Sequence, residues 1–351
     1  MEQTFTQGKG GRLLRPFSTK AEVYCRSYSL PLQRVITDFG ADVPFGRIGE
    51  KLREHHGISV PISSGQAISQ NHAACVHQTQ LLHTETPTIA GVEQLIVEMD
   101  GTLIPIVEAP EAVDEDGLPI DRRTTRQTRF KEARLALARS AQESQLKFGA
   151  TFGTPDDAVT QLLDCAIAAG LGANTQVHAA LDGAQWIANT VIAQFGSSAT
   201  YLLDFYHLSE YLAAASVVCA PTHPNIWLEH QQLRLKRNEW QQVLAALRPH
   251  LESLTAADEQ APVRAAYRYI QNRPNQLDYQ GAIAADLPIG SGEIESAHRY
   301  VILERLDIAG AWWTVEKAEE LLSLRVLRAN QRWNDYWANL IPMVAPLDCH
   351  F

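Results

Sequence analysis

Basic residues are scarce in this chain relative to acidic ones. It has 30 lysines and arginines against 40 aspartates and glutamates, so its formal net charge is −10 at pH 7. A protein that coats nucleic acid needs lysine and arginine for its phosphate contacts. The charge balance therefore counts against that class of protein, unless the basic side chains gather in one part of the chain.

Cysteine is also scarce. The cysteines are odd in number, lie far apart and never form a Cys-x-x-Cys pair. This pattern argues against both a disulfide framework and a zinc ribbon. We expect all five to be buried thiols: Cys25, Cys75, Cys165, Cys219 and Cys349.

Long apolar runs are absent. No stretch approaches the roughly 18 consecutive apolar residues of a membrane span, and the amino terminus, with Gly8, Lys9 and Gly10, has no apolar signal core. We therefore expect a soluble, cytoplasmic protein with no membrane partner. With 351 residues and 45% hydrophobic content, the chain can bury a full core and form two or three domains.

The basic residues do gather in one stretch. Between Asp121 and Arg139 the acids are outnumbered by Arg122, Arg123, Arg126, Arg129, Lys131, Arg134 and Arg139. This stretch is either a solvated face or a surface that contacts nucleic acid. For the second interpretation, the DNA-contacting residues are Arg122, Arg123, Arg126 and Arg129.

Two helices around a turn are expected near the amino terminus. The first covers residues 45–56 and the second begins near Ser63, whose side chain can cap it. This pattern favours a helix-turn-helix, whose second helix offers Gln66 and Gln70 to base edges. Any helical hairpin gives the same pattern, so both interpretations stay open.

Strand and helix patterns alternate through the middle of the chain, which indicates an α/β fold. Strands are expected near 94–107, 129–138 (or a helix there), 148–152, 177–181 and 199–205, with helices at 155–169 and 184–195. We expect residues 208 to about 272 to form an all-helical insertion that is broken at Pro221, Pro224 and Pro249, and amphipathic helices to follow at 290–306 and 315–337.

Three acids stand where these elements end or begin. Two apolar runs end on Asp-Gly pairs, at Asp100 and at Asp182, and a glycine-rich turn at 290–292 precedes Glu293 and Glu295. We expect the aspartates at the ends of neighbouring strands and Glu295 in the first turns of a helix packed on the sheet. Three carboxylates suit two Mg²⁺ ions about 3.5–4 Å apart and phosphoryl chemistry.

Each acid has a structural alternative. Asp100 can be a hairpin turn residue, Asp182 the cap of the next helix, and Glu295 an acid favoured by the helix dipole. Two positions along a helix differ by about 200°, so Glu293 and Glu295 cannot face one site. We prefer Glu295 because Arg299, one turn further along the same face, can reach a phosphate.

A further pair, Asp204 and His207, follows the strand expected at 199–205. Asp204 competes with Asp182 as the second metal ligand. Three interpretations of His207 stay open: it supports a metal ligand through a hydrogen bond, it acts as a general base, or it is a hydrogen-bonded structural residue.

Four motifs in this order resemble the DDE transposases of bacterial insertion sequences, and among them the Kra-type branch related to Mutator-like elements. The resemblance runs from about Leu32 to Trp337. The motifs are Glu98–Thr102, Leu181–Ile187, Asp204–His207 and Pro288–Ser296.

The resemblance implies a ribonuclease-H-like core with an all-helical insertion before the glutamate helix. It makes Asp100, Asp182 and Glu295 the catalytic triad that binds two Mg²⁺ ions, for which Mn²⁺ can substitute, and gives Asp204 and His207 supporting roles. The implied domains are a helix-turn-helix-like DNA-binding region at 1–90, the first part of the core at 91–208, the insertion at 209–285 and the last part of the core at 286–351.

The implied function is a DNA transposase that cleaves 3′ ends at the terminal inverted repeats of its own element and joins them to target DNA, as a dimer or larger assembly on DNA. Two alternatives stay open. One is a catalytically inactive, decayed or repurposed DNA-binding protein, which the acidic balance favours. The other is a ribonuclease-H-like nuclease without strand transfer.

Overall fold

The computed structural model describes residues 28–344, except 84, 110–117, 119 and 184, together with residues 5–6, 13–14 and 23–24. The amino-terminal strands form two short antiparallel pairs: β1 (Phe5–Thr6) with β2 (Leu13–Leu14), and β3 (Val23–Tyr24) with β4 (Tyr28–Ser29). Within the described part of the chain, no helix has the length and apolar character needed to cross a membrane.

The chain divides into two compact units. The first unit comprises residues 1–81, 103–133 and 298–351, and the second comprises residues 82–102 and 134–297. Each unit is therefore assembled from segments that are far apart in the sequence.

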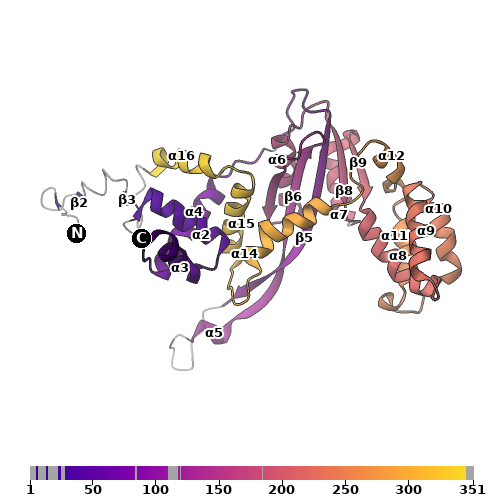
Figure 1. The fold of residues 1–351 in the computed structure, drawn as a ribbon, viewed down its shortest axis with the longest axis horizontal. Helices are drawn as coiled ribbons and strands as arrows, with labels where there is room; N and C mark the ends of the chain where they lie inside the picture. The colour runs from indigo at the N-terminus through magenta and orange to yellow at the C-terminus, as the bar shows by residue number, and fades with distance from the viewer. Residues whose placement is uncertain are drawn as a thin grey trace. The chain divides into compact units, whose positions relative to one another are not determined.

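A five-stranded mixed sheet, apart from residues 103–108 and 127–133 of its strands, forms the centre of the second unit (Figure 1). Its order is β7-β6-β5-β8-β9, in which β8 runs parallel to β5 and β9 while β7 is antiparallel to β6. The α/β class expected from the sequence is confirmed. The strands are β5 (Gln94–Glu108), β6 (Gln127–Ser140), β7 (Lys147–Thr151), β8 (Gln176–Leu181) and β9 (Ala199–Leu203).

Alternation along the strands gives this sheet two different faces. Successive side chains of a strand point to opposite faces, and the odd-numbered Leu95, Val97, Val177 and Ala179 pack with the helices α6 (Pro155–Ala168) and α7 (Gln185–Phe195). The even-numbered side chains of β5 and β8 are thereby directed to the other face.

Five α-helices lie in the chain between β9 and the helix that carries Glu295 (Figure 1). Their buried residues, such as Leu212, Leu235 and Ile270, form one core with Leu202 and Leu203 of β9, so this helical region is built on the edge of the sheet. The helices are α8 (Phe205–Cys219), α9 (Pro224–Lys236), α10 (Trp240–Leu247), α11 (Pro262–Gln271) and α12 (Tyr279–Ala284).

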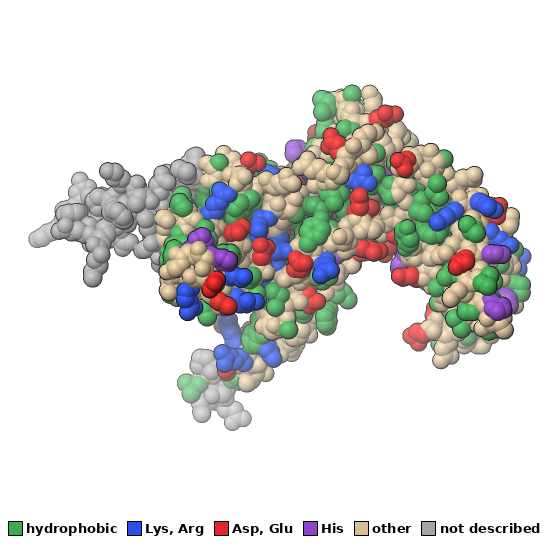
Figure 2. Space-filling view, viewed as in Figure 1, with side chains coloured by type: hydrophobic (Ala, Val, Ile, Leu, Met, Phe, Trp, Pro, Cys, Tyr) green, Lys and Arg blue, Asp and Glu red, His purple; other side chains and the backbone are tan. Residues whose placement is uncertain are grey.

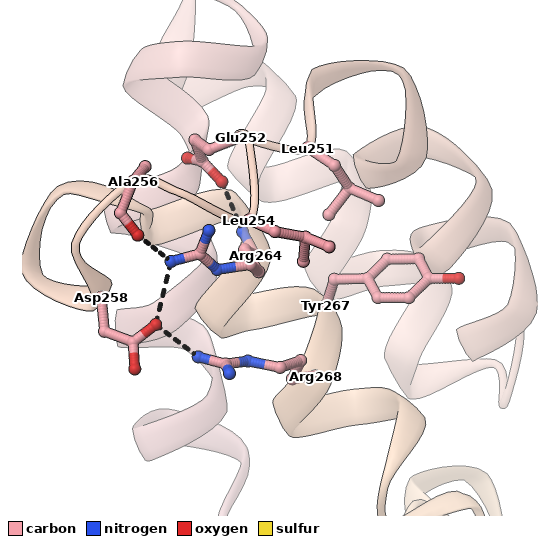
Figure 3. Close-up of a pocket in the computed structure, with 8 residues that line it drawn as sticks. All are labelled: Leu251, Glu252, Leu254, Ala256, Asp258, Arg264, Tyr267 and Arg268. Carbon is pink, nitrogen blue, oxygen red and sulfur yellow. Dashed lines mark hydrogen bonds and ion pairs between the residues drawn. The ribbon is translucent and has the colours of Figure 1, made fainter.

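The loop between α10 and α11 is held by a buried arginine (Figure 3). Arg264 donates to the carbonyl of Ala256 at 2.6 Å and to Asp258 at 2.9 Å, and Arg268 donates to the same carboxylate oxygen. Glu252 accepts from the backbone N–H of Arg264 at 2.8 Å, at the start of α11. These residues line a cavity beside the loop, and their charged groups bind one another, which suits a structural role.

The first unit is built mainly from helices. The predicted pair is present: α3 ends at Gly57, whose φ of 65° is the left-handed conformation that closes many helices. The residue that precedes α4 is Pro61, and Ser63 lies inside the helix. The prediction that the Ser63 side chain caps the second helix is therefore wrong. The helices are α2 (Leu30–Asp42), α3 (Phe45–His56), α4 (Ile62–Thr79), α15 (Val315–Ala329) and α16 (Trp333–Val344).

Two other predicted elements differ from the structure. β5 continues through Asp100 and Gly101, so the alternative of a hairpin turn there is wrong. The single helix expected at 315–337 is interrupted near Gln331, whose φ is 60°, and forms α15 and α16. The glutamate helix begins at Gly292 and includes a π-helical segment, His298–Leu303, between α13 (Gly292–Ala297) and α14 (Glu304–Leu306).

The structure describes three of the cysteines, and of these Cys165 is buried, as predicted. Cys75 and Cys219 are half-buried, so the prediction of buried thiols is wrong for them. Cys25 and Cys349 lie outside the described residues.

His72 is a buried histidine in the first unit. Its Nδ1 lies 2.8 Å from the Tyr336 hydroxyl and its Nε2 lies 3.0 Å from Oε1 of Gln33. Its ring centroid is 4.6 Å from that of Trp337. Burial lowers the pKa of His72 from 6.5 to about 4.

This shift predicts an acid-sensitive stability. The unfolded chain protonates His72 as pH falls below 6.5, whereas the folded chain does not until about pH 4, so the stabilisation is complete above pH 6.5 and is lost between these values. From pH 7.5 to pH 5, the His72→Gln variant should lose about 2 kcal/mol less stability than the wild type. Urea denaturation at both pH values measures this, and equal losses would refute it.

Candidate active site

Three aspartates lie in or directly after neighbouring parallel strands: Asp100 within β5, Asp182 after β8 and Asp204 after β9. The ladders of β5 with β8 and of β8 with β9 pair Val97 with Ala179, and Leu181 with Leu203. Continuing the same offsets aligns Asp100 with Asp182, and Asp182 with Asp204. Adjacent strands lie about 4.8 Å apart, so these carboxylates gather on the even-numbered face of the sheet.

The two Asp-Gly pairs have different backbone settings. Asp100 is half-buried within β5 and accepts from the Gly101 N–H at 2.7 Å; the strand continues beyond it, so the prediction that it ends the strand is wrong. Asp182 directly follows β8, as expected. Its carbonyl accepts from the Tyr201 hydroxyl, and Nε of Arg273 donates to the carbonyl of Gly183 at 3.2 Å. Residue 184 is not described, so the cap alternative for Asp182 stays open.

Asp204 uses both carboxylate oxygens to fasten separate elements. Oδ1 accepts from the N–H groups of Tyr206 at 2.6 Å and His207 at 2.8 Å, which caps α8. Oδ2 accepts from the backbone N–H of Ser291 at 2.6 Å and from its hydroxyl at 2.5 Å. The end of β9 is thereby joined to the glycine-rich turn before α13.

Gly290 makes this close approach possible. A Cβ atom at this position would stand 2.5 Å from a ring carbon of Tyr206. Real Cβ contacts are not this short, so a larger residue would force either the turn or the Tyr206 ring to move.

Glu98 fastens α13 to the central strand. Its side chain is fully buried, and its Oε2 accepts from the Ile294 N–H at 2.7 Å. Its Oε1 has no hydrogen-bond partner among the described residues. Burial raises the pKa of Glu98 to about 8, so the side chain is mainly protonated at neutral pH. This role was missed, although a glutamate inside an apolar strand run is a visible signal.

The two glutamates of α13 have different partners. Glu293 accepts from Nε of Arg139, which lies 2.9 Å from each carboxylate oxygen. Glu295 is exposed at the residue level, and its pKa is raised by desolvation and then by the charges of Asp204 and Asp100. Glu295 is therefore within electrostatic reach of Asp100.

The supporting residues predicted around these acids are placed as follows. His207 lies in the first turn of α8, with Nδ1 3.8 Å from Glu210 and its ring against Tyr211. Arg299 lies in the first unit, 3.8 Å from Glu304. The π-helical segment begins at His298 and interrupts the regular helical spacing from which Arg299 was predicted to share a face with Glu295.

The acids do not converge on a single ion. Within the described ranges, no three His, Cys, Asp or Glu side chains lie close enough together to hold one metal ion. Asp100 is aligned with Asp182 and interacts with Glu295, but the predicted triad does not form one ligand sphere in this structure.

The predicted DNA-contacting residues all lie in the first unit. Gln66 is exposed and Gln70 half-buried on α4, and both line a cavity with Trp312. Of the arginines, Arg126 stacks on Trp312 at 4.5 Å and Arg129 lies 3.5 Å from Glu108. Arg122 and Arg123 are exposed in the short helix α5 (Arg122–Thr125). Figure 2 shows lysine and arginine interspersed with acidic side chains on the visible face of this unit.

Part of the chain matches a family model. The model of an uncharacterised protein family (UPF0236) matches residues 172–331, a range that includes Asp182, Asp204, His207 and Glu295 but not Asp100. No curated protein matches the chain.

The bonds of Asp204 predict a large loss of stability in Asp204→Ala. This change removes the acceptor of four hydrogen bonds and leaves buried donors unmet, so we expect about 3 kcal/mol of destabilisation. Ser291→Ala is the matched control, because it removes only the hydroxyl donor and should cost about 1 kcal/mol. Urea denaturation compares the two variants, and an equal cost for both would contradict this account.

Proposed function

We propose that this protein is a DNA transposase of the DDE type, with Asp100, Asp182 and Glu295 as its catalytic acids. The observation that carries the proposal is the parallel register of β5 and β8, which, continued from Val97 and Ala179, brings Asp100 level with Asp182, beside a helix that is bonded to β5 through Glu98. The pKa of Glu295, raised in part by the charge of Asp100, supports its membership of the same site.

We also propose that the sheet forms a ribonuclease-H-like core. A ribonuclease-H-like core is supported by the order β7-β6-β5-β8-β9, in which antiparallel strands are followed by parallel ones. The helices α8 to α12 lie in the chain between β9 and α13, where the resemblance to DDE transposases predicts an insertion. The domain division at residues 90, 208 and 285 remains a prediction.

The donor chemistry fits Mg²⁺. Mg²⁺ prefers oxygen ligands and is usually bound by one or two carboxylates, with water and substrate phosphates completing its shell. Asp100 and Asp182, with Glu295, would hold two such ions, and Mn²⁺ can substitute. When bound, the ions supply Lewis-acid stabilisation and an activated water or hydroxyl for phosphoryl transfer.

The surrounding residues orient the acids. Asp204 holds the glycine-rich turn and Glu98 holds the first turn of α13. Arg139 donates to both carboxylate oxygens of Glu293. In this proposal Glu295 is therefore the acid of α13 that acts in the active site. In this proposal Asp204 and His207 support the site rather than bind the ions, and Arg299 contacts a phosphate.

DNA is the proposed substrate and partner. The enzyme would bind the terminal inverted repeats of its element and then target DNA, as a dimer or larger assembly in the cytoplasm. Its proposed DNA contacts are Gln66, Gln70, Arg122, Arg123, Arg126 and Arg129. Cleavage of the 3′ ends and strand transfer are both phosphoryl transfers, so one site serves both steps.

A second candidate is a DNA-binding protein without catalytic activity. The net charge of −10 and the lack of a three-acid cluster among the described residues favour it. A ribonuclease-H-like nuclease without strand transfer would use the same acids and differs only in its products.

The test is cleavage of labelled DNA that carries the sequences flanking the gene, with Mg²⁺, Mn²⁺ or EDTA. We expect metal-dependent cutting at the element boundary and joined strands, both reduced to background in Asp100→Ala, Asp182→Ala and Glu295→Ala. Glu229→Ala, an exposed acid on α9, is the control and should keep full activity.

Each other outcome selects an alternative. Specific binding without cutting favours the DNA-binding protein, and nicks without joined strands favour the nuclease. Full activity in any of the three acid variants overturns the catalytic assignment.

A further inference from the structure

A cavity of about 330 Å³ lies within the first unit, between α4 and the loop after α14. This volume is at the lower end of the roughly 300–1,000 Å³ typical of small-molecule sites, which suits a ligand of one or two rings. The aromatic and polar residues that line the cavity are Phe45, Gln66, Gln70, Arg305, Trp312 and Trp313.

Arg305 lines this cavity and has an unmet donor. Its side chain is 2% exposed, and its Nε donates to the carbonyl of Gly40 at 3.0 Å. Its guanidinium lies over the rings of Phe45 at 4.6 Å and Trp313 at 4.9 Å. Nη2 is buried and has no hydrogen-bond partner among the described residues. A buried, unpaired donor on a charged group is costly, so a ligand oxygen here would satisfy it.

Burial lowers the pKa of Arg305 only to about 10, so the side chain is charged at neutral pH. A charged donor forms stronger hydrogen bonds than a neutral one. An oxygen that carries partial or full negative charge is therefore the preferred partner of Nη2.

Trp312 supplies an exposed aromatic surface at the same cavity. It is 44% exposed, and the guanidinium of Arg126 stacks on its ring. The neighbouring Trp313 is anchored, because its Nε1 donates to the carbonyl of Leu306 at 3.1 Å and its own carbonyl accepts from Val107. The anchored backbone thus presents Trp312 as a platform on which a flat ring can stack.

We propose that this cavity binds one unpaired nucleobase of the DNA, an inference that rests on the proposed function. The base stacks on Trp312, one of its carbonyl oxygens accepts from Nη2 of Arg305, and its edge bonds the side-chain amides of Gln66 and Gln70. An amide both donates and accepts, as the edge of a base does.

This assignment changes the role of the two glutamines. They were predicted to read paired bases in a groove, but they line a cavity with aromatic walls. A single unpaired base can enter such a cavity, whereas a paired base is held within the stacked duplex. Adenine has no carbonyl oxygen for Arg305, so thymine, cytosine and guanine should bind more tightly than adenine.

The experiment measures the affinity of labelled duplex DNA that carries one bulged thymine, compared with the same duplex fully paired, with a bulged adenine, and with a bulged abasic site. Stacking of one base contributes enough to predict about tenfold tighter binding of the bulged thymine than of the paired duplex. The bulged adenine should fall between them, and the abasic bulge should bind like the paired duplex.

Variants assign this preference to the cavity. Trp312→Ala should remove the preference for bulged thymine and leave the affinity for paired duplex unchanged. Trp312→Phe, which retains a stacking ring, should keep most of it. The matched control is Trp333→Ala, because Trp333 also stacks with an arginine, Arg328, but does not line the cavity.

The outcomes separate this inference from the proposed function. Equal affinity for bulged and paired duplexes, or a preference that survives in Trp312→Ala, overturns the inference while DNA binding stands. Failure of every duplex to bind overturns the proposed function and this inference together.

Discussion

The buried carboxylate of Asp204 joins three elements of the second unit that are distant in the chain. It follows β9, caps α8 and holds the turn at Ser291 that leads into α13. Because one side chain satisfies the donors of both helical regions, the helices after β9 and the glutamate helix are fixed to the same end of the sheet. The orientation of Glu295 depends on this contact and on the bond from Ile294 to Glu98.

The same constraint concentrates negative charge. The strand registers direct Asp100, Asp182 and Asp204 to the same face of the sheet, and the pKa of Glu295 is raised by desolvation and then by the charges of Asp204 and Asp100. Nearby negative charges disfavour the ionised form of each carboxylic acid. The protein offsets part of the cost by pairing Glu293 with Arg139 and by burying Glu98 in its protonated form. In the function proposed above, a bound cation would offset the remainder.

The first unit uses arginine in place of a purely apolar core. Arg325 of α15 is buried and donates to the carbonyls of Val301 and Ala41, both at 2.6 Å. The guanidinium of Arg305 lies over two aromatic rings, and its Nη2 has no hydrogen-bond partner in the part of the chain that the structure describes. The first arginine fastens helices together, whereas the second lines a cavity, so burial of the same residue type serves different purposes in one unit.

The sequence by itself determined the α/β class, most elements of the sheet and the position of Asp182 after its strand, because these follow from periodicity and from Asp-Gly signals along one segment. It did not determine that β5 continues past Asp100, that Arg139 occupies Glu293, or that Gln66 and Gln70 share a cavity with Trp312. These facts depend on contacts between residues far apart in the chain. Only the tertiary structure decides them, since strand pairing and burial of a charge are settled by neighbours that no local pattern specifies.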